Sequence, residues 1–75
     1  MFARMAEAAG LPKKQMYTLP EASEATGIPY GTLYRSAVDG SLETFLAPGR
    51  RRGRKVRPEW MDEWLESGLS GGGDR

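Results

Sequence analysis

Two short helices joined by a tight turn are predicted over residues 18–40 by the spacing of apolar positions. The first helix has a narrow stripe at i, i+3 and i+7 that we expect to be buried, made of Leu19, Ala22 and Thr26. The second helix, roughly residues 30–39, places Leu33 and Ala37 on one face and ends at Gly40. Such a pair is either a helix-turn-helix, whose second helix usually enters the DNA major groove, or an ordinary helical hairpin in a small core.

The ends of these helices carry specific signals. Thr18 is a good N-cap, and Glu21 three residues later completes a capping box. Pro20 falls in the first turn, where a backbone N–H would have no partner within the helix, so its absence costs no hydrogen bond. Gly27 can adopt a positive φ and end the first helix, and Pro29 prevents its continuation. These signals predict a first helix that begins after Thr18 and ends at Gly27.

A β-hairpin with a basic tip is predicted over residues 41–57. Residues 41–46 are rich in β-prone side chains, and residues 54–57 form a second short strand centred on Val56. The connection over residues 47–53 contains proline, glycine and three arginines, and it is longer than a tight hairpin turn. We therefore expect a wing with a mobile tip, preceded by a short strand or extended segment at Met16 and Tyr17.

A third helix is predicted from Pro58 to about Glu66, with Ser67 and Gly68 ending it. One wide face is apolar and consists of Trp60, Met61, Trp64 and Leu65. The opposite face is acidic and consists of Glu59, Asp62, Glu63 and Glu66. We interpret the two tryptophans as core residues rather than stacking platforms for bases, and the carboxylates as a solvated face rather than a metal or acid–base site.

The fold class that follows is mainly α with a small β-hairpin, in a winged helix-turn-helix arrangement. We expect residues 1–15 to be a mobile N-terminal arm, residues 16–67 to form the domain, and residues 68–75 to be a disordered tail. The chain of 75 residues can bury only a small core, so its stability should be marginal.

Charge is distributed unevenly, although the net charge is only +1. Six of the 11 basic residues lie within residues 50–57, which contain no acid, and the rest of the chain therefore carries −5. Clustering of this kind is typical of nucleic-acid binders. The sequence has no Cys and no His, so the usual nucleophiles, general bases and metal ligands are missing. We expect no enzyme activity, no cofactor, no bound metal and no membrane segment, and a cytoplasmic location.

The candidate DNA-binding residues fall into two groups. On the second helix they are Tyr30, Gly31, Thr32, Tyr34 and Arg35. On the wing they are Arg50, Arg51, Arg52, Arg54 and Lys55. Arg35 is the best candidate to read a base, because a guanidinium can bond guanine O6 and N7 as a fork. The tyrosines and Thr32 suit phosphate and sugar contacts, and Gly31 permits close approach of the backbone.

The order of these features resembles the small winged-helix domains of phage excisionases, which are related to the DNA-binding domain of MerR-type regulators. The likeness covers residues 17–66. It rests on the following segments: Tyr17-Thr18-Leu19-Pro20-Glu21-Ala22, Gly27-Ile28-Pro29, Thr32-Leu33-Tyr34-Arg35, Gly40, the basic run 50–57, and Trp60 with Trp64-Leu65-Glu66. The chain differs from the family in its small Ser23, Ala25 and Thr26 and in having no bulky aromatic near Ser36.

The resemblance implies a recombination directionality factor without catalytic activity. Such a protein binds repeated sites in double-stranded DNA beside neighbouring copies of itself, bends the DNA, contacts a phage integrase and favours excision. The same domain resembles small transcriptional regulators that bind direct repeats and the DNA-recognition subunits of phage packaging enzymes, so these roles remain alternatives. A further alternative, from another class, is a protein-interaction module whose basic hairpin docks an acidic partner.

Overall fold

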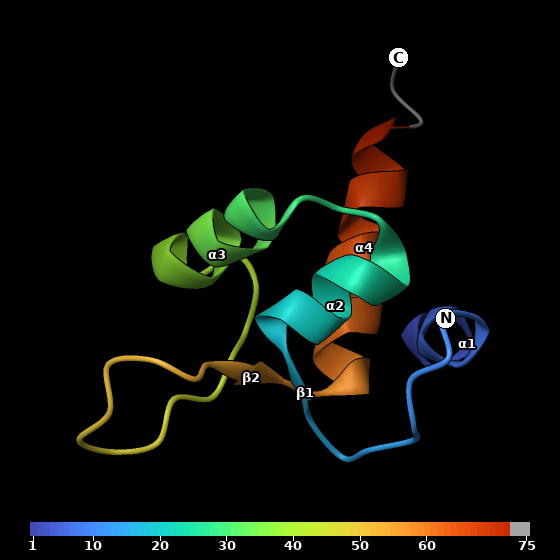
Figure 1. The fold of residues 1–75 in the computed structure, drawn as a ribbon. Coiled ribbons are helices and arrows are strands. Elements are labelled where there is room, and N and C mark those ends of the chain that lie inside the picture. Colours follow the sequence, from blue (N-terminus) through green and yellow to red (C-terminus); the bar gives the residue numbers. More distant parts are fainter. Residues whose placement is uncertain (73–75) are drawn as a thin grey trace.

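The structure is a computed structural model that describes residues 1–72, and the side chains of residues 1–68. Within these residues, four helices accompany a two-stranded antiparallel sheet (Figure 1). In chain order the elements are α1 (Phe2–Ala8), β1 (Tyr17–Thr18), α2 (Leu19–Thr26), α3 (Tyr30–Asp39), β2 (Lys55–Val56) and α4 (Pro58–Gly72). The fold is therefore mainly helical with a small sheet, as the apolar pattern predicts.

Helix α2 begins with the predicted capping box. The backbone N–H of Glu21 donates to the Thr18 hydroxyl at 3.2 Å, and the Thr18 N–H donates to the Glu21 carboxylate at 2.9 Å. Gly27 ends the helix with a φ of +77°, a conformation that L side chains rarely adopt. Pro29 then serves as the N-cap of α3. The predicted bounds of both helices are confirmed.

The core is built from side chains of all four helices and both strands. Its members are Phe2, Ala6, Tyr17, Leu19, Ala22, Leu33, Ala37, Leu42, Val56 and Met61. From α4, Met61 is fully buried, whereas Trp60 and Trp64 are half-buried and pack against the core from outside. The prediction for the tryptophans therefore needs correction: they border the core, and the smaller Met61 occupies its centre.

Residues 2–8 form α1, where the sequence predicts a mobile arm over residues 1–15. Phe2 is fully buried, and its ring meets that of Tyr17 edge to face, with centroids 5.1 Å apart. Its backbone N–H donates to the carboxylate of Asp62 at 2.7 Å, which ties α1 to α4. The prediction of a mobile arm is therefore wrong for the residues of α1. A helix this short is marginal alone, and packing against α2 and α4 stabilises it.

The linker between α1 and β1 is also attached to the rest of the protein. The Tyr17 hydroxyl accepts a hydrogen bond from the Lys14 N–H at 3.0 Å and donates to the Pro12 carbonyl at 3.3 Å. The ammonium of Lys14 pairs with the Glu21 carboxylate at 2.6 Å. These contacts join the linker to the start of α2, so the ordered domain begins well before residue 16.

The sheet pairs two segments that are far apart in the sequence. In the antiparallel register of β1 and β2, Tyr17 lies opposite Val56 and Thr18 lies opposite Lys55. The strand expected at Met16 and Tyr17 is thus present one residue later, and its partner is the second strand of the predicted hairpin.

The predicted hairpin is reduced to a single bridge. Phe45 and Lys55 exchange two backbone hydrogen bonds, at 2.7 Å and 2.8 Å, and the predicted strand over residues 41–46 does not extend further. Leu42 instead enters the core, and its N–H donates to the Ser36 carbonyl at the end of α3. Leu42 is thus held beside α3, and the pairing of residues 41–46 with β2 is limited to the bridge at Phe45.

Helix α4 continues to Gly72, beyond the predicted end at Glu66. Gly68 lies within the helix and does not take the positive φ that ends α2 and α3. Serine and glycine have low helix propensity. Adding them to an existing helix costs less than starting a new one, so they need not end it. The prediction of a disordered tail over residues 68–75 is therefore wrong for residues 68–72, and residues 73–75 lie outside the described part of the chain.

The capping contacts of Glu21 predict how stability depends on pH. The pKa of Glu21 is held below its ordinary value of 4.5, first by the hydrogen bond from Lys14 and then by that from the Thr18 backbone. Stabilisation by a carboxylate with a lowered pKa is complete above its unfolded-state pKa and is lost as the pH falls through its folded-state pKa. Glu21 should therefore contribute to stability at neutral pH and cease to do so in acid.

Glu21→Gln keeps a capping group while removing the titration and the ion pair. We expect the variant to lose less unfolding free energy than the parent between about pH 5 and about pH 3. Urea titrations followed by circular dichroism at each pH measure this difference. Glu66→Gln, which removes an exposed carboxylate of α4, is the control and should follow the parent. Identical acid profiles for the parent and Glu21→Gln would contradict the assignment.

Candidate nucleic-acid interface

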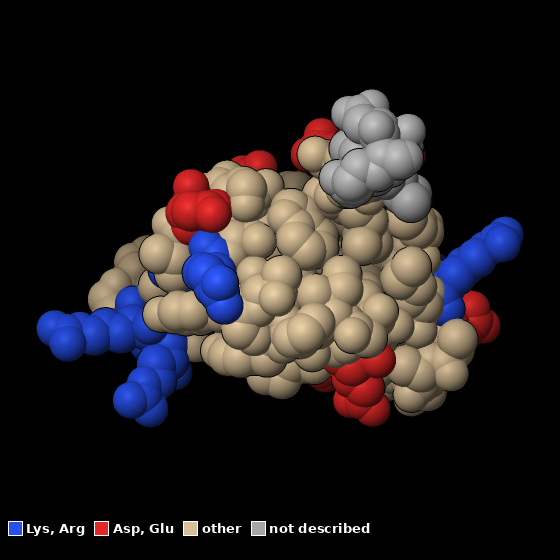
Figure 2. Space-filling model, turned by 90° about the horizontal axis from the view of Figure 1, so that it is seen from above, with Lys and Arg blue, Asp and Glu red and all other residues tan. Residues whose placement is uncertain are grey.

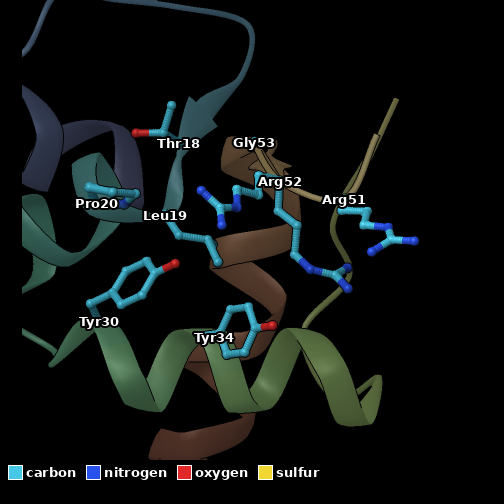
Figure 3. A pocket seen from close by; sticks show the side chains of 9 residues that line it. Thr18, Leu19, Pro20, Tyr30, Tyr34, Arg51, Arg52 and Gly53 are labelled. Atoms are coloured by element: carbon cyan, nitrogen blue, oxygen red, sulfur yellow. The ribbon is translucent and has the colours of Figure 1, made fainter. Parts of the chain in front are cut away.

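A groove of about 650 Å³ lies between the start of α2, one side of α3 and the loop that the Phe45–Lys55 bridge closes. We call residues 46–54 the arginine loop. The residues that line the groove are Thr18, Leu19, Pro20, Tyr30, Tyr34, Arg51, Arg52, Gly53 and Arg54 (Figure 3). It is the meeting point of three segments that are separated in the sequence.

The α3 side of the groove is formed by two tyrosines. Tyr30 and Tyr34 are one helical turn apart, and their rings are stacked with centroids 6.1 Å apart and planes 25° from parallel. They are 48% and 47% exposed, so about half of each side chain is open to solvent. Both rings project from α3 towards the start of α2 and the arginine loop (Figure 3). An exposed aromatic pair with two hydroxyls can contact both sugar and phosphate.

The opposite wall carries guanidinium groups that have no acidic partner. Arg50, Arg51 and Arg52 are exposed, and none of them forms an ion pair with another described residue. Arg54 is half-buried, and its guanidinium donates to the Thr44 hydroxyl at 3.4 Å, which fixes the base of the loop. Lys55 is exposed on β2 and likewise lacks an acidic partner within the described residues. These five cations therefore remain available to an external anion.

Arg57 differs from the other basic residues of this segment. Its guanidinium pairs with the Glu59 carboxylate at 2.8 Å and lies 5.8 Å from the centroid of the Trp60 ring. Arg57 therefore already has an acidic partner within the protein. The six clustered charges counted in the sequence reduce to five available ones in the structure.

The remaining candidate residues of α3 lie outside the groove on the exposed surface of the helix. Gly31, Thr32 and Arg35 are all exposed, as predicted, and a Cβ on Gly31 would meet nothing within 4 Å. Val38 is 56% exposed on the same helix and was not identified from the sequence. Val38 follows Tyr34 by four residues, and this helical spacing predicts that it lies beside the tyrosines.

The structure thus brings together half of the predicted site residues. Lining one groove are Tyr30, Tyr34, Arg51, Arg52 and Arg54. Exposed but not lining the groove are Gly31, Thr32, Arg35, Arg50 and Lys55. The sequence missed the third wall, formed by Thr18, Leu19 and Pro20, because these residues were assigned only to the start of a helix.

The charge around this site is arranged asymmetrically. Basic side chains project from the end of the molecule where α3 and the arginine loop lie, at the left in Figure 2. At the C-terminal end of α3, the Ser41 N–H donates to Asp39 at 2.8 Å and holds the pKa of that carboxyl below its ordinary value. Asp39 therefore stays ionised and disfavours a polyanion there, so the N-terminal part of α3 and the arginine loop are the favourable surface for one.

Within residues 1–72 no group of three His, Cys, Asp or Glu side chains is placed to hold a metal ion. None of the described helices is both long enough and apolar enough to cross a membrane. Comparison with known proteins finds no matching family model, no similar curated protein and no similar solved structure.

Proposed function

We propose that this protein binds double-stranded DNA as a winged helix-turn-helix, with α3 as the recognition helix and the arginine loop as the wing. The observation that carries the proposal is the single groove in which the tyrosines of α3 face an array of unpaired arginines. Aromatic hydroxyls and guanidinium groups on one surface match a phosphate backbone with sugars beside it.

Helix α3 has the dimensions and surface that a major groove accepts. The groove of B-DNA is about 12 Å wide and admits one α-helix. Leu33 and Ala37 are buried against the core, which leaves the opposite face of α3 free along its length. Arg35 on that face is the proposed guanine reader, while Thr32 and the tyrosines set the register on phosphate and sugar. The absence of a side chain at Gly31 allows the helix backbone to approach the bases.

The arginine loop supplies the second part of the interaction. Arg51 and Arg52 are exposed in this loop and line the groove, where they can reach phosphates and the adjacent minor groove. Guanidinium groups favour narrow, A·T-rich minor grooves because the negative potential is stronger there. Simultaneous contact by α3 and the loop would fix the protein on two adjacent grooves.

The biological role that we propose is that of an excisionase-like recombination directionality factor. This part rests on the resemblance in the sequence. A domain of this size makes a small interface with DNA, so a single copy should bind weakly and neighbouring copies on repeated sites should bind more strongly. The role is tested in an excision reaction that contains a phage integrase and DNA bearing its attachment sites: adding the protein should increase excision and decrease integration.

Salt dependence tests DNA binding itself. Each phosphate contact contributes about −0.9 to the slope of log K against log salt concentration. Five unpaired cations over residues 50–55 therefore predict a slope of about −4 to −5 for one copy on a duplex. Fluorescence anisotropy with a short labelled duplex at several salt concentrations measures it. A nearly flat dependence would refute the phosphate contacts and favour the alternative in which the loop docks an acidic protein.

A further inference from the structure

A second groove, of about 260 Å³, lies between α4 and the segment that follows α3. It is lined by Gly40, Ser41, Glu43, Trp60, Glu63, Trp64 and Ser67, and we call it the tryptophan groove. It shares no lining residue with the groove of the arginine loop. The proposed DNA-binding function therefore does not use it.

The chemistry of the tryptophan groove is opposite to that of the DNA-facing site. Its two rings, Trp60 and Trp64, are half-buried and keep part of their surface open to the groove. Glu43 and Glu63 are exposed at its edge, and neither forms an ion pair with another described residue. No lysine or arginine lines it. The groove combines aromatic surface with unneutralised negative charge.

One contact within the protein illustrates what such a surface accepts. The guanidinium of Arg57 lies 5.8 Å from the centroid of the Trp60 ring while it pairs with a carboxylate, Glu59. A cation over an aromatic face is attracted by the ring quadrupole, and tryptophan is the strongest of the aromatic side chains in this respect. Trp60 is also one of the two rings of the tryptophan groove, where carboxylates again lie beside the indoles and no lysine or arginine is among the lining residues.

We infer that the tryptophan groove docks an arginine- or lysine-bearing segment of a protein partner. The cationic head group would lie against Trp60 and Trp64, and its N–H groups would donate to Glu43 and Glu63. Charge complementarity selects this occupant, because the same carboxylates repel a nucleic-acid backbone. A volume of about 260 Å³ accommodates one or two side chains, so the contact alone is weak. It becomes effective when the partner is held nearby, for example on the same DNA.

The test uses the full chain and a defined probe. The probe is a capped peptide of alternating arginine and alanine, and its matched control has glutamine in place of each arginine. The indole N–H signals of Trp60 and Trp64, followed by two-dimensional NMR, report binding at the groove. We expect the arginine peptide to shift both indole signals in a saturable way and the glutamine peptide to shift neither.

Two variants on one helix make the test specific. Glu63→Gln removes a carboxylate that lines the groove, and Glu66→Gln removes one on the same helix that does not. Both side chains are exposed, so both variants should fold. We expect Glu63→Gln to weaken peptide binding about fivefold and Glu66→Gln to change it less than about twofold, since exposed ion pairs contribute modestly. Equal weakening by the two variants, or no saturable shift of the indoles, would overturn the inference.

The alternative occupants give different results. If duplex DNA shifts the indole signals in the absence of peptide, the groove belongs to a nucleic-acid site and the inference is wrong. If the signals move with protein concentration alone, the occupant is a second copy of this chain and the inference is again wrong. Arg51→Ala together with Arg52→Ala should leave peptide binding intact, which separates failure of this inference from failure of the proposed DNA binding.

Discussion

Phe2→Ala is expected to leave little folded protein. Truncation of a fully buried phenylalanine typically costs about 3–5 kcal/mol. A core in a chain of this size rarely supplies more than about 3–5 kcal/mol of net stability. Phe2 has no exposed surface, packs edge to face on Tyr17 and anchors α1 against α2 and α4. Its loss should therefore remove the helix that the sequence alone predicts to be a mobile arm.

Two further variants isolate the reason for the loss. Phe45→Ala removes the same side chain from a position that is 43% exposed, and we expect it to cost about 1 kcal/mol or less. Phe2→Leu keeps most of the buried volume but loses the aromatic contact with Tyr17, and we expect an intermediate cost of about 1 kcal/mol. Urea unfolding followed by circular dichroism measures all three. Equal small losses for Phe2→Ala and Phe45→Ala would show that α1 does not support the fold.

The sequence predicts α2 and α3 well because their ends are determined locally. The capping box of Thr18 and Glu21 involves residues three positions apart, and Gly27 and Pro29 act on their own backbone. No contact with a distant segment is needed to decide where these helices begin and end. The same holds for the buried faces, where Leu33 and Ala37 follow helical periodicity.

The errors concern elements that depend on distant contacts. Helix α1 has little stability of its own and forms because Phe2 meets Tyr17 and Asp62, the latter far along the chain. The sheet is a similar case: β2 pairs with the distant β1, whereas the segment just before the arginine loop meets β2 only at the Phe45–Lys55 bridge. Periodicity over a short window contains no information about either partner.

The sequence predicts most of the residue types of the candidate site, but not how these residues are arranged in space. The basic run and the exposed residues of α3 are visible in the sequence, yet their meeting with the start of α2 in one groove depends on the loop path. The pairing of Arg57 with Glu59 is a local contact that the sequence permits, but both side chains are exposed and the pair competes with solvation. Only the structure removes Arg57 from the count of available cations.

The roles of α3 and the arginine loop should separate on mutation. Arg35→Ala is expected to cost about 1–3 kcal/mol on a specific site and to relax sequence preference there, because it removes a fork of hydrogen bonds to one base. Arg35 is exposed on α3 and makes no ion pair with the described residues, so its loss should not affect folding. Binding to a scrambled duplex should change little.

Replacing Arg51 and Arg52 together by alanine should weaken binding by a comparable factor, but without regard to sequence. A hydrogen bond to a charged group contributes about 1.5–3 kcal/mol. Because both arginines are exposed, each contributes less than this, and we expect the loss of two contacts to weaken binding roughly thirtyfold or more. The loss should be similar on specific and scrambled duplexes, since phosphates carry no sequence information. The salt slope should become shallower by about two units. Arg57→Gln is the matched control, because this arginine is already paired, and it should leave both affinity and slope nearly unchanged.

Titrations of the variants on specific and scrambled DNA, each at two salt concentrations, distinguish the possible outcomes. Suppose Arg35→Ala weakens both duplexes equally while the loop variant loses discrimination. The loop would then read the sequence, through the width and potential of the minor groove, and α3 would serve as the anchor. That result would reverse the assigned roles but leave DNA binding in place. If neither variant weakens binding to any duplex, the groove between α3 and the arginine loop does not bind DNA.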